Sequence, residues 1–223
     1  MREDDAGYDV FDAVFARAEM AEVLAALDRT TLVRTKAGVR HVLSLPRVRQ
    51  LAGDPRMIRL ASRFVGPNAT PFRATLFDKS PRSNWLIVWH QDTALPMCDR
   101  LDDPSWGPWS TKGGVLYSHA PAWALESVVA LRVQLDDSTT TNGPLRVLPH
   151  THRRGVLSDA RVQELADQIA PVECVTTAGG VIAMRPLTIH ASSKSTDDRP
   201  RRVLHIEYAT GLELRRGVHL AAV

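Results

Sequence analysis

The sequence predicts a mainly β protein, a double-layered antiparallel barrel or sandwich with helices packed on one side. Helical patterning is confined to the N-terminal part and one later segment. From about residue 72 onward, the chain consists of short segments rich in Val, Ile, Leu and aromatic residues. Turn residues such as Asn142-Gly143-Pro144 and Gly179-Gly180 separate these segments, as expected between antiparallel strands.

Three segments carry the helical pattern. Residues 11–28 place apolar side chains at helical spacing, and Asp9 is predicted to cap this helix. Residues 46–65 are predicted to form two shorter helices that break near residues 53–55. Residues 156–170 are predicted to form a helix at the surface.

The strand-like segments follow one another closely along the chain. They are residues 72–77, 85–92, 129–135, 144–148, 172–176, 180–184 and 201–209. Between two of them lies the stretch 93–128, which is rich in Pro, Gly and Trp. This stretch is predicted to be a long loop, and loops of that length in a compact domain often act as lids.

Composition limits the classes of function. The chain has 223 residues, of which 44% are hydrophobic and 24% charged, as in ordinary soluble domains. The net charge of 28 − 25 = +3 is too small to indicate a nucleic-acid partner. No apolar run approaches the roughly 18 residues that span a bilayer. The two cysteines fit a reducing compartment, so we expect a cytoplasmic protein without nucleic-acid or membrane partners.

A metal site is predicted at the end of the segment Trp85–Asp92. Alternate side chains of a strand share a face, so His90 and Asp92 point the same way. The best third ligand is His190, which ends the apolar run 180–189. Two histidines and one carboxylate that leave open coordination positions are typical of the facial triad of Fe(II) oxygenases.

The HxD pattern is short, and alternatives to a metal site remain open at this point. A buried His90 that is hydrogen-bonded to Asp92 explains the segment equally well. His150 and His152 form a second strand-spaced pair, but they follow a proline and precede two arginines, so they rank below His190.

A binding site for an organic acid is predicted beyond His190. Arg201 opens the next strand after a turn, and its guanidinium can hold one end of a dicarboxylate while the other end chelates iron. Strand parity places Arg201 and His205 on one face and Arg202 on the other. A solvated edge is the alternative explanation for these arginines.

Longer runs extend these patterns over almost the whole chain after residue 40. They include Trp89-His90-Gln91-Asp92, Leu135-Asp136-Asp137, Asn142-Gly143-Pro144-Leu145-Arg146-Val147-Leu148-Pro149, Met184-Arg185-Pro186, His190-Ala191-Ser192-Ser193 and Arg199-Pro200-Arg201-Arg202-Val203-Leu204-His205-Ile206-Glu207-Tyr208. On these runs the chain resembles the phytanoyl-CoA dioxygenase family of Fe(II)- and 2-oxoglutarate-dependent oxygenases, in particular its short bacterial members. Two of these runs depart from the family's usual sequence, which reads Pro-Gly-Ser-His at one and His-Gly-Ser at the other. Neither departure removes an expected metal ligand.

The resemblance implies a double-stranded β-helix (jelly-roll) core with flanking helices. Residues 1–223 are then expected to be a single domain. Within it, residues 1–70 form a mainly helical part, residues 71–223 form the jelly-roll core, and residues 93–128 form the lid loop.

The resemblance also assigns site residues. His90, Asp92 and His190 are the implied iron ligands. Arg201, eleven residues past the distal histidine, is the implied anchor for 2-oxoglutarate, with Ser192 as a second donor. The resemblance adds Trp109 for the co-substrate. Position along the chain, independent of the resemblance, adds Lys79 for the co-substrate and Arg132, Arg73, His119 and Trp106 for the substrate.

The expected reaction is the hydroxylation of an unactivated C–H bond of a small-molecule substrate, with release of succinate and CO2. It requires Fe(II), 2-oxoglutarate as co-substrate, and O2. Halogenating relatives lack the carboxylate ligand, so Asp92 favours hydroxylation or desaturation. Two alternatives remain: a cupin-type metalloenzyme that does not use 2-oxoglutarate, and a non-catalytic jelly roll that binds a small molecule. The protein is expected to be a monomer or homodimer.

Overall fold

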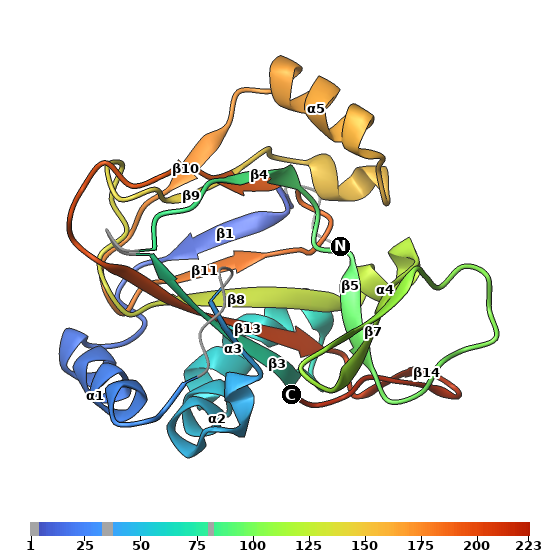
Figure 1. Cartoon of the computed structure of the whole chain (residues 1–223), viewed down its shortest axis with the longest axis horizontal. Helices are drawn as coiled ribbons and strands as arrows, with labels where there is room; N and C mark the ends of the chain where they lie inside the picture. The colour runs from blue at the N-terminus through green and yellow to red at the C-terminus, as the bar shows by residue number, and fades with distance from the viewer. Residues whose placement is uncertain (1–4, 33–37, 80–82) are drawn as a thin grey trace.

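Two antiparallel sheets face each other in the computed structural model, which describes residues 5–32, 38–79 and 83–223 (Figure 1). The large sheet has the strand order β1 (Tyr8–Phe11), β11 (Val181–Met184), β8 (Val128–Gln134), β13 (Arg201–Ala209), β3 (Thr70–Lys79) and β2 (Val39–Arg40). The small sheet has the order β10 (Val172–Cys174), β9 (Leu145–Val147), β12 (His190–Ser192) and β4 (Ile87–His90). The predicted jelly-roll fold is confirmed.

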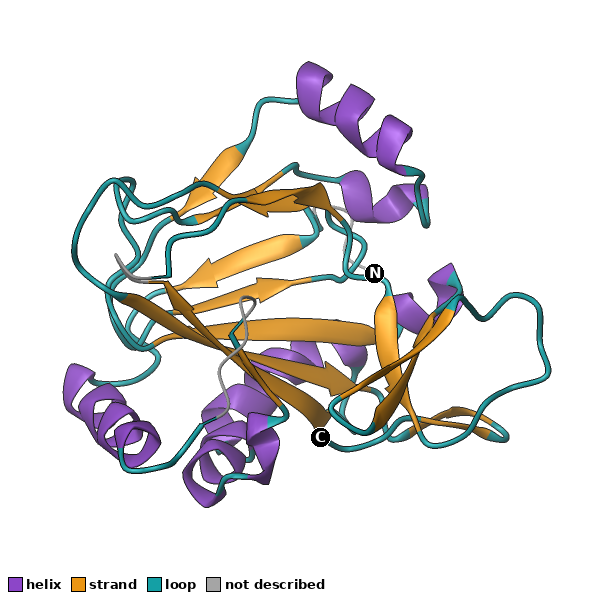
Figure 2. Cartoon of the chain, viewed as in Figure 1, coloured by secondary structure: helices purple, strands orange, loops and turns teal. Residues whose placement is uncertain are grey.

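Helices cover the outer faces of both sheets (Figure 2). Against the large sheet lie α1 (Arg17–Asp28), α2 (Pro46–Ala52) and α3 (Pro55–Val65), together with the short helix η1 (Val42–Ser44). Beside the small sheet lie α5 (Asp159–Gln168) and η2 (Thr151–Arg154). Among the described residues, no helix has the length and apolar character needed to cross a membrane.

The helices begin where side chains satisfy their free amides. The Asp54 carboxylate accepts a hydrogen bond from the Arg56 amide at 2.8 Å, and this cap starts α3 directly after the predicted break. The Ser158 hydroxyl accepts one from the Arg161 amide at 3.3 Å and starts α5 in the same way. The predicted helices at 46–65 and 156–170 are therefore confirmed.

The prediction for residues 11–28 is wrong at its N-terminal end. Asp9 belongs to strand β1 and caps no helix, and α1 begins only after Ala16. The Ala16 amide donates to the Glu19 carboxylate at 2.8 Å, which stabilises this start. The apolar side chain at Phe11 belongs to the edge strand, so its helical spacing to the later residues was accidental.

The stretch 93–128, which we predicted to be a long loop, contains regular structure. A third sheet has the order β5 (Ala94–Met97), β7 (Val115–His119) and β6 (Trp109–Lys112), and α4 (Ala122–Glu126) follows it. The hairpin β14 (Glu213–Arg215) and β15 (Val218–His219) follows β13 near the C-terminal end of the chain. These strands are too short to show a clear alternation in the sequence, and β5 is apolar throughout while β6 is mainly polar. A role as a lid stays a prediction.

The central strands of the large sheet separate two kinds of side chain. Leu131 and Val133 of β8 and Leu204 of β13 lie in the core that packs against the helices. Their neighbours in sequence, Arg132 and His205, point into the space between the sheets and are also buried. This alternation follows from the two-residue period of a strand, and it gives the jelly roll a polar interior.

The turn before β11 requires a glycine. Gly179 has φ +91°, and a Cβ there would lie 2.1 Å from the Phe15 carbonyl oxygen. We therefore expect Gly179→Ala to lower the free energy of unfolding by about 3 kcal/mol, from the left-handed backbone and the clash together. Denaturant unfolding measures this loss.

Gly217→Ala is the matched control. Gly217 also has a positive φ, of +78°, but its Cβ would meet nothing within 4 Å. Only the backbone cost of about 1 kcal/mol is expected there. Equal losses for the two variants would contradict a steric role for Gly179.

Candidate functional site

The candidate metal ligands come together because β12 pairs with β4. In this antiparallel register, His190 lies directly opposite His90. His190 begins β12 and does not end the apolar run 180–189 as we predicted, because β11 stops at Met184 and a turn follows it. Asp92 lies just past the end of β4, where its amide donates to the Pro186 carbonyl at 2.9 Å.

The three side chains form one compact donor set. Asp92 Oδ1 lies 3.7 Å from His90 Nε2, and Asp92 Oδ2 lies 3.5 Å from His190 Nε2. One ligand atom from each residue fits within a mutual distance of 4.8 Å. Among the described residues, this is the one cluster of three or more such side chains with metal-binding spacing.

Backbone contacts fix both imidazoles in a form that suits metal binding. His90 Nδ1 donates to the Val88 carbonyl at 2.8 Å, and His190 Nδ1 donates to the Thr188 carbonyl at 2.9 Å. In a neutral imidazole the other nitrogen, Nε2, then carries the free lone pair. Both lone pairs are available on the side where Asp92 lies.

The charges at this site favour a divalent cation. Burial, and then the neighbouring His90, lower the pKa of His190 to about 4, so it is neutral at pH 7. Burial alone would raise the pKa of Asp92, but the nearby His190, His90, His205 and Arg73 hold it well below its usual value. Two imidazole nitrogens and one carboxylate fit Fe(II), and as three protein donors they leave room for other ligands.

A second buried site lies on β13 and β3. Arg201 is 4% exposed, and its guanidinium donates to the Asn142 carbonyl at 3.2 Å and to Ser192 Oγ at 3.3 Å. Lys79 is 2% exposed and donates from Nζ to the same Ser192 Oγ at 2.9 Å. The Ser192 hydroxyl itself donates to the Gly143 carbonyl at 2.8 Å. Ser192 therefore brings two cations together.

These cations lack a negative partner within the described part of the chain. Arg201, Lys79 and the nearby Arg132 form no ion pair there, and Arg132 donates instead to His205 Nδ1 at 2.9 Å. Burial, and then the like charges of Arg201 and Arg132, lower the pKa of Lys79 to about 7. Burial and Arg132 lower that of Arg201 to about 9. Buried cations without acids indicate a site for an anionic ligand.

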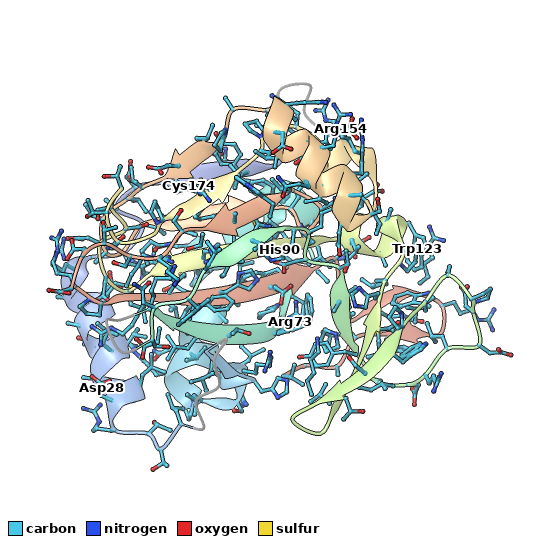
Figure 3. All side chains as sticks on the ribbon, turned by 45° about the horizontal axis from the view of Figure 1, so that its top comes forward. Asp28, Arg73, His90, Trp123, Arg154 and Cys174 are labelled. Atoms are coloured by element: carbon cyan, nitrogen blue, oxygen red, sulfur yellow. The ribbon has the colours of Figure 1, made fainter. Side chains whose placement is uncertain are left out.

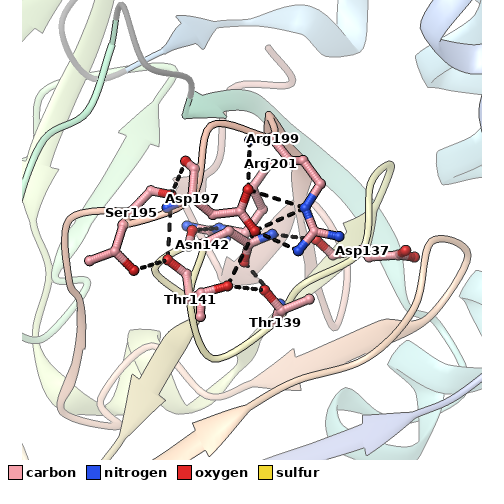
Figure 4. A network of polar contacts seen from close by, with 9 residues as sticks. Asp137, Thr139, Thr141, Asn142, Ser195, Asp197, Arg199 and Arg201 are labelled. Atoms are coloured by element: carbon pink, nitrogen blue, oxygen red, sulfur yellow. Dashed lines mark hydrogen bonds and ion pairs between the residues drawn. The ribbon is translucent and has the colours of Figure 1, made fainter.

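The loop that holds Arg201 is itself fixed by a polar network (Figure 4). The Asn142 side chain bonds the Asp137 carbonyl at 2.7 Å and the Thr139 amide at 2.9 Å, which orients the Asn142 carbonyl toward Arg201. A Cβ at Gly143 would lie 3.0 Å from Lys79 Nζ and even closer to a backbone oxygen. The Asn-Gly pair of the sequence is therefore needed to shape this pocket.

Arg73, which we predicted to contact an organic acid, is paired within the protein. Its guanidinium forms a bidentate ion pair with the buried Glu207 carboxylate and also donates to the Ala94 carbonyl at 2.9 Å. Arg73 lies below His90 in the opening between the sheets (Figure 3). Its charge is thus offset by Glu207, although it still helps to lower the pKa of Asp92.

The aromatic candidates lie in the third sheet and its loops. Trp109 is in β6 and packs against an apolar cluster that includes Leu95 and Leu125, with the Arg100 guanidinium 5.7 Å from its ring centre. Trp106 is buried against Trp123 in an edge-on contact, and its indole nitrogen has no partner among the described residues. His119 is exposed, and its Nδ1 lies 2.7 Å from the Thr93 hydroxyl. Their roles in ligand binding stay predictions.

An open cleft leads to the triad. It has a volume of about 570 Å³, and His90 and Asp92 lie in its wall. The same wall includes Trp85, Phe77 and Arg40. Of these, Arg40 was absent from our sequence prediction, because a single arginine far from the motifs carries no signal of its position in the fold.

Comparison with known proteins identifies the family. The family model described as phytanoyl-CoA dioxygenase matches residues 4–203. The chain belongs to the phytanoyl-CoA dioxygenase family. The predicted family is therefore confirmed, and with it the general class of dioxygenase.

This member of the phytanoyl-CoA dioxygenase family has distant curated relatives. It is 24% identical to L-proline trans-4-hydroxylase of Streptomyces griseoviridis, over 69% of this chain and 59% of that protein. The chain thus spans less than two thirds of that relative. It is 22% identical to ectoine dioxygenase of Bordetella bronchiseptica, over 91% of this chain and 71% of that protein.

The fold is shared with solved structures of this kind. One of them is the epimerase SnoN in complex with Fe3+, alpha-ketoglutarate and nogalamycin RO, with a TM-score of 0.67 and 21% identity. The match covers 92% of this chain and 79% of that one. The expected oligomeric state and cytoplasmic location are untested and stay predictions.

The triad predicts a defined change in metal affinity. Asp92→Ala removes the single charged donor, so the affinity for Fe(II) is expected to fall at least about 100-fold. Anaerobic Fe(II) titration measures this change. Asp103→Ala, at an exposed carboxylate outside the site, should bind Fe(II) like the parent. Undiminished affinity in Asp92→Ala would remove Asp92 from the ligand set.

Proposed function

We propose that the protein is an Fe(II)- and 2-oxoglutarate-dependent dioxygenase that hydroxylates an unactivated C–H bond of a small-molecule substrate. The observation that carries this proposal is that a metal-binding site and an anion-binding pocket lie next to each other. One is a His-Asp-His donor set with free Nε2 lone pairs. The other is a buried pocket whose cations Arg201 and Lys79 have no acidic partner in the described chain.

In this proposal His90, Asp92 and His190 hold Fe(II). Together with 2-oxoglutarate and O2, the iron supplies the oxidising chemistry that releases succinate and CO2 and leaves one oxygen atom on the substrate. The two imidazoles contribute neutral donors, and Asp92 contributes one negative charge. The backbone bonds at both Nδ1 atoms keep the rings from turning away from the ion.

Arg201 and Lys79 anchor the distal carboxylate of 2-oxoglutarate. A guanidinium presents two parallel donors to a carboxylate, and the ammonium adds a third. Both groups are desolvated before the ligand arrives, so their attraction for an anion is little screened by water. Arg132 extends this positive interior toward the triad, where its charge interacts with Asp92 and His190, and it contributes to the same attraction.

The relatives support this activity at the level of reaction type. One relative is named as a hydroxylase and another as a dioxygenase. The SnoN complex holds iron together with alpha-ketoglutarate. A cupin-type enzyme without 2-oxoglutarate would have no use for two buried, unneutralised cations next to its metal. A non-catalytic binding jelly roll would not need a complete donor triad.

Neighbouring arginines of β13 test the role of the anion pocket. Arg201 faces the interior, whereas Arg202 lies on the opposite face and pairs with Asp136 at 2.8 Å. Arg201→Gln is expected to weaken 2-oxoglutarate binding by about 100-fold, since a charged bidentate contact is lost. Titration of the visible charge-transfer band of the anaerobic Fe(II) complex measures this affinity.

Arg202→Gln is the matched control for this experiment. It should bind 2-oxoglutarate like the parent, although the lost ion pair lowers stability. If both variants bind alike, or if the parent shows no band with 2-oxoglutarate, the proposed function is contradicted.

Lys79 predicts a pH dependence of co-substrate binding. Its pKa of about 7 means that it is charged at pH 6 and largely neutral at pH 8. A bound carboxylate favours the charged form, so the Kd for 2-oxoglutarate is expected to rise about tenfold between pH 6 and pH 8. Lys79→Met should bind more weakly at pH 6 and lose this dependence. A parent Kd that is flat or falls over this range would exclude a titrating Lys79.

A further inference from the structure

The cleft that opens on the triad has an apolar wall next to the metal ligands. Leu86 is 55% exposed and Val88 68% exposed, although both belong to the segment that leads to His90. Trp85 and Phe77 line the same cleft. Apolar side chains that stay uncovered beside a reactive centre indicate contact with an apolar part of a ligand.

Positive charge gathers at the rim of this cleft. Arg40, at the end of β2, is exposed and lines the cleft together with His90 and Asp92. Lys112, at the end of β6, lies close enough to Arg40 and Arg73 for their charges to interact. Neither Arg40 nor Lys112 forms an ion pair with any residue that the structure describes.

An aromatic ring holds Lys112 in place without neutralising it. Lys112 Nζ lies 5.0 Å from the centre of the buried Tyr117 ring, and the Arg73 guanidinium lies 5.6 Å from that centre. The Tyr117 hydroxyl bonds His41 Nε2 at 2.9 Å. A cation–π contact fixes the position of an ammonium and leaves its net charge intact.

The nearby acids do not offset this charge. Glu207 is bound on both oxygens by Arg73. Asp92 belongs to the proposed iron ligands. Burial, followed by the like charges of Arg40 and Arg73, lowers the pKa of Lys112, and it lowers that of His41 for the same reasons. The rim therefore carries uncompensated positive potential that a bound anion would relieve.

We propose that the substrate is an amphipathic anion. Its oxyanion, a carboxylate or a phosphate, is bound by Arg40 and Lys112, and its apolar body lies along Trp85, Leu86 and Val88 toward the metal. This inference rests on the proposed function, because it names the substrate class of the same site. In this arrangement the substrate anion binds at the rim of the cleft. The co-substrate anion binds at a different place, at Arg201 inside the barrel.

Four probes with one apolar body and different head groups test this assignment. They are octanoate, octyl phosphate, octanamide and octylammonium, titrated calorimetrically into the anaerobic Fe(II) protein at saturating 2-oxoglutarate, which occupies the Arg201 pocket. The anions are expected to bind at least about tenfold more tightly than octanamide, and octylammonium more weakly than octanamide. The tighter of the two anions identifies the head group.

Variants locate the head-group site. Arg40→Gln and Lys112→Gln are each expected to remove most of the preference for the anions over octanamide. Arg216→Gln changes an exposed arginine in the turn between β14 and β15, and it should retain the preference. Because Arg40 is exposed and Lys112 half-buried, neither change threatens the core.

Two results would overturn the inference. One is equal affinity for octanoate, octyl phosphate and octanamide in the parent. The other is a preference that persists in both Arg40→Gln and Lys112→Gln. Failure of the proposed function has a different signature, since the parent would then show no spectral response to 2-oxoglutarate while the preference for anions remained.

Discussion

The antiparallel pairing of β12 with β4 is the constraint on which the site depends. It sets His190 opposite His90 and brings both rings within reach of Asp92. Because side chains alternate along a strand, a slip of one residue would turn His190 out of the interior. The backbone carbonyls of Val88 and Thr188 then fix the two rings. The donor set is thus a product of sheet register, supported by hydrogen bonds to the main chain.

The same alternation divides the large sheet into a face that stabilises the fold and a face that binds. Leu131, Val133 and Leu204 pack against the helices, while Arg132 and His205 occupy the interior. Buried cations without acidic partners destabilise an empty protein, since desolvation is not offset. Such local conflicts are expected at binding sites, where a ligand supplies the missing charge.

Much of this arrangement was predictable from the sequence. Strand parity gave the shared face of His90 and Asp92 and the opposite faces of Arg201 and Arg202, since it needs only the local period. The strands of residues 93–128 were missed, because segments of four or five residues are too short to show a clear alternation. The contacts of Arg40 with the cleft and of Lys112 with Tyr117 depend on how distant elements meet, which no local pattern encodes.

The Ser192 hydroxyl has only one proton, and it points to the Gly143 carbonyl. In this ligand-free arrangement its oxygen therefore accepts from Lys79 and Arg201 at once, and its role as a donor to 2-oxoglutarate stays a prediction. Two groups of equal sign are held side by side by this one neutral oxygen, which acts as an electrostatic spacer between them. Without it, the ammonium and the guanidinium would share no acceptor within the protein, and less would offset their mutual repulsion.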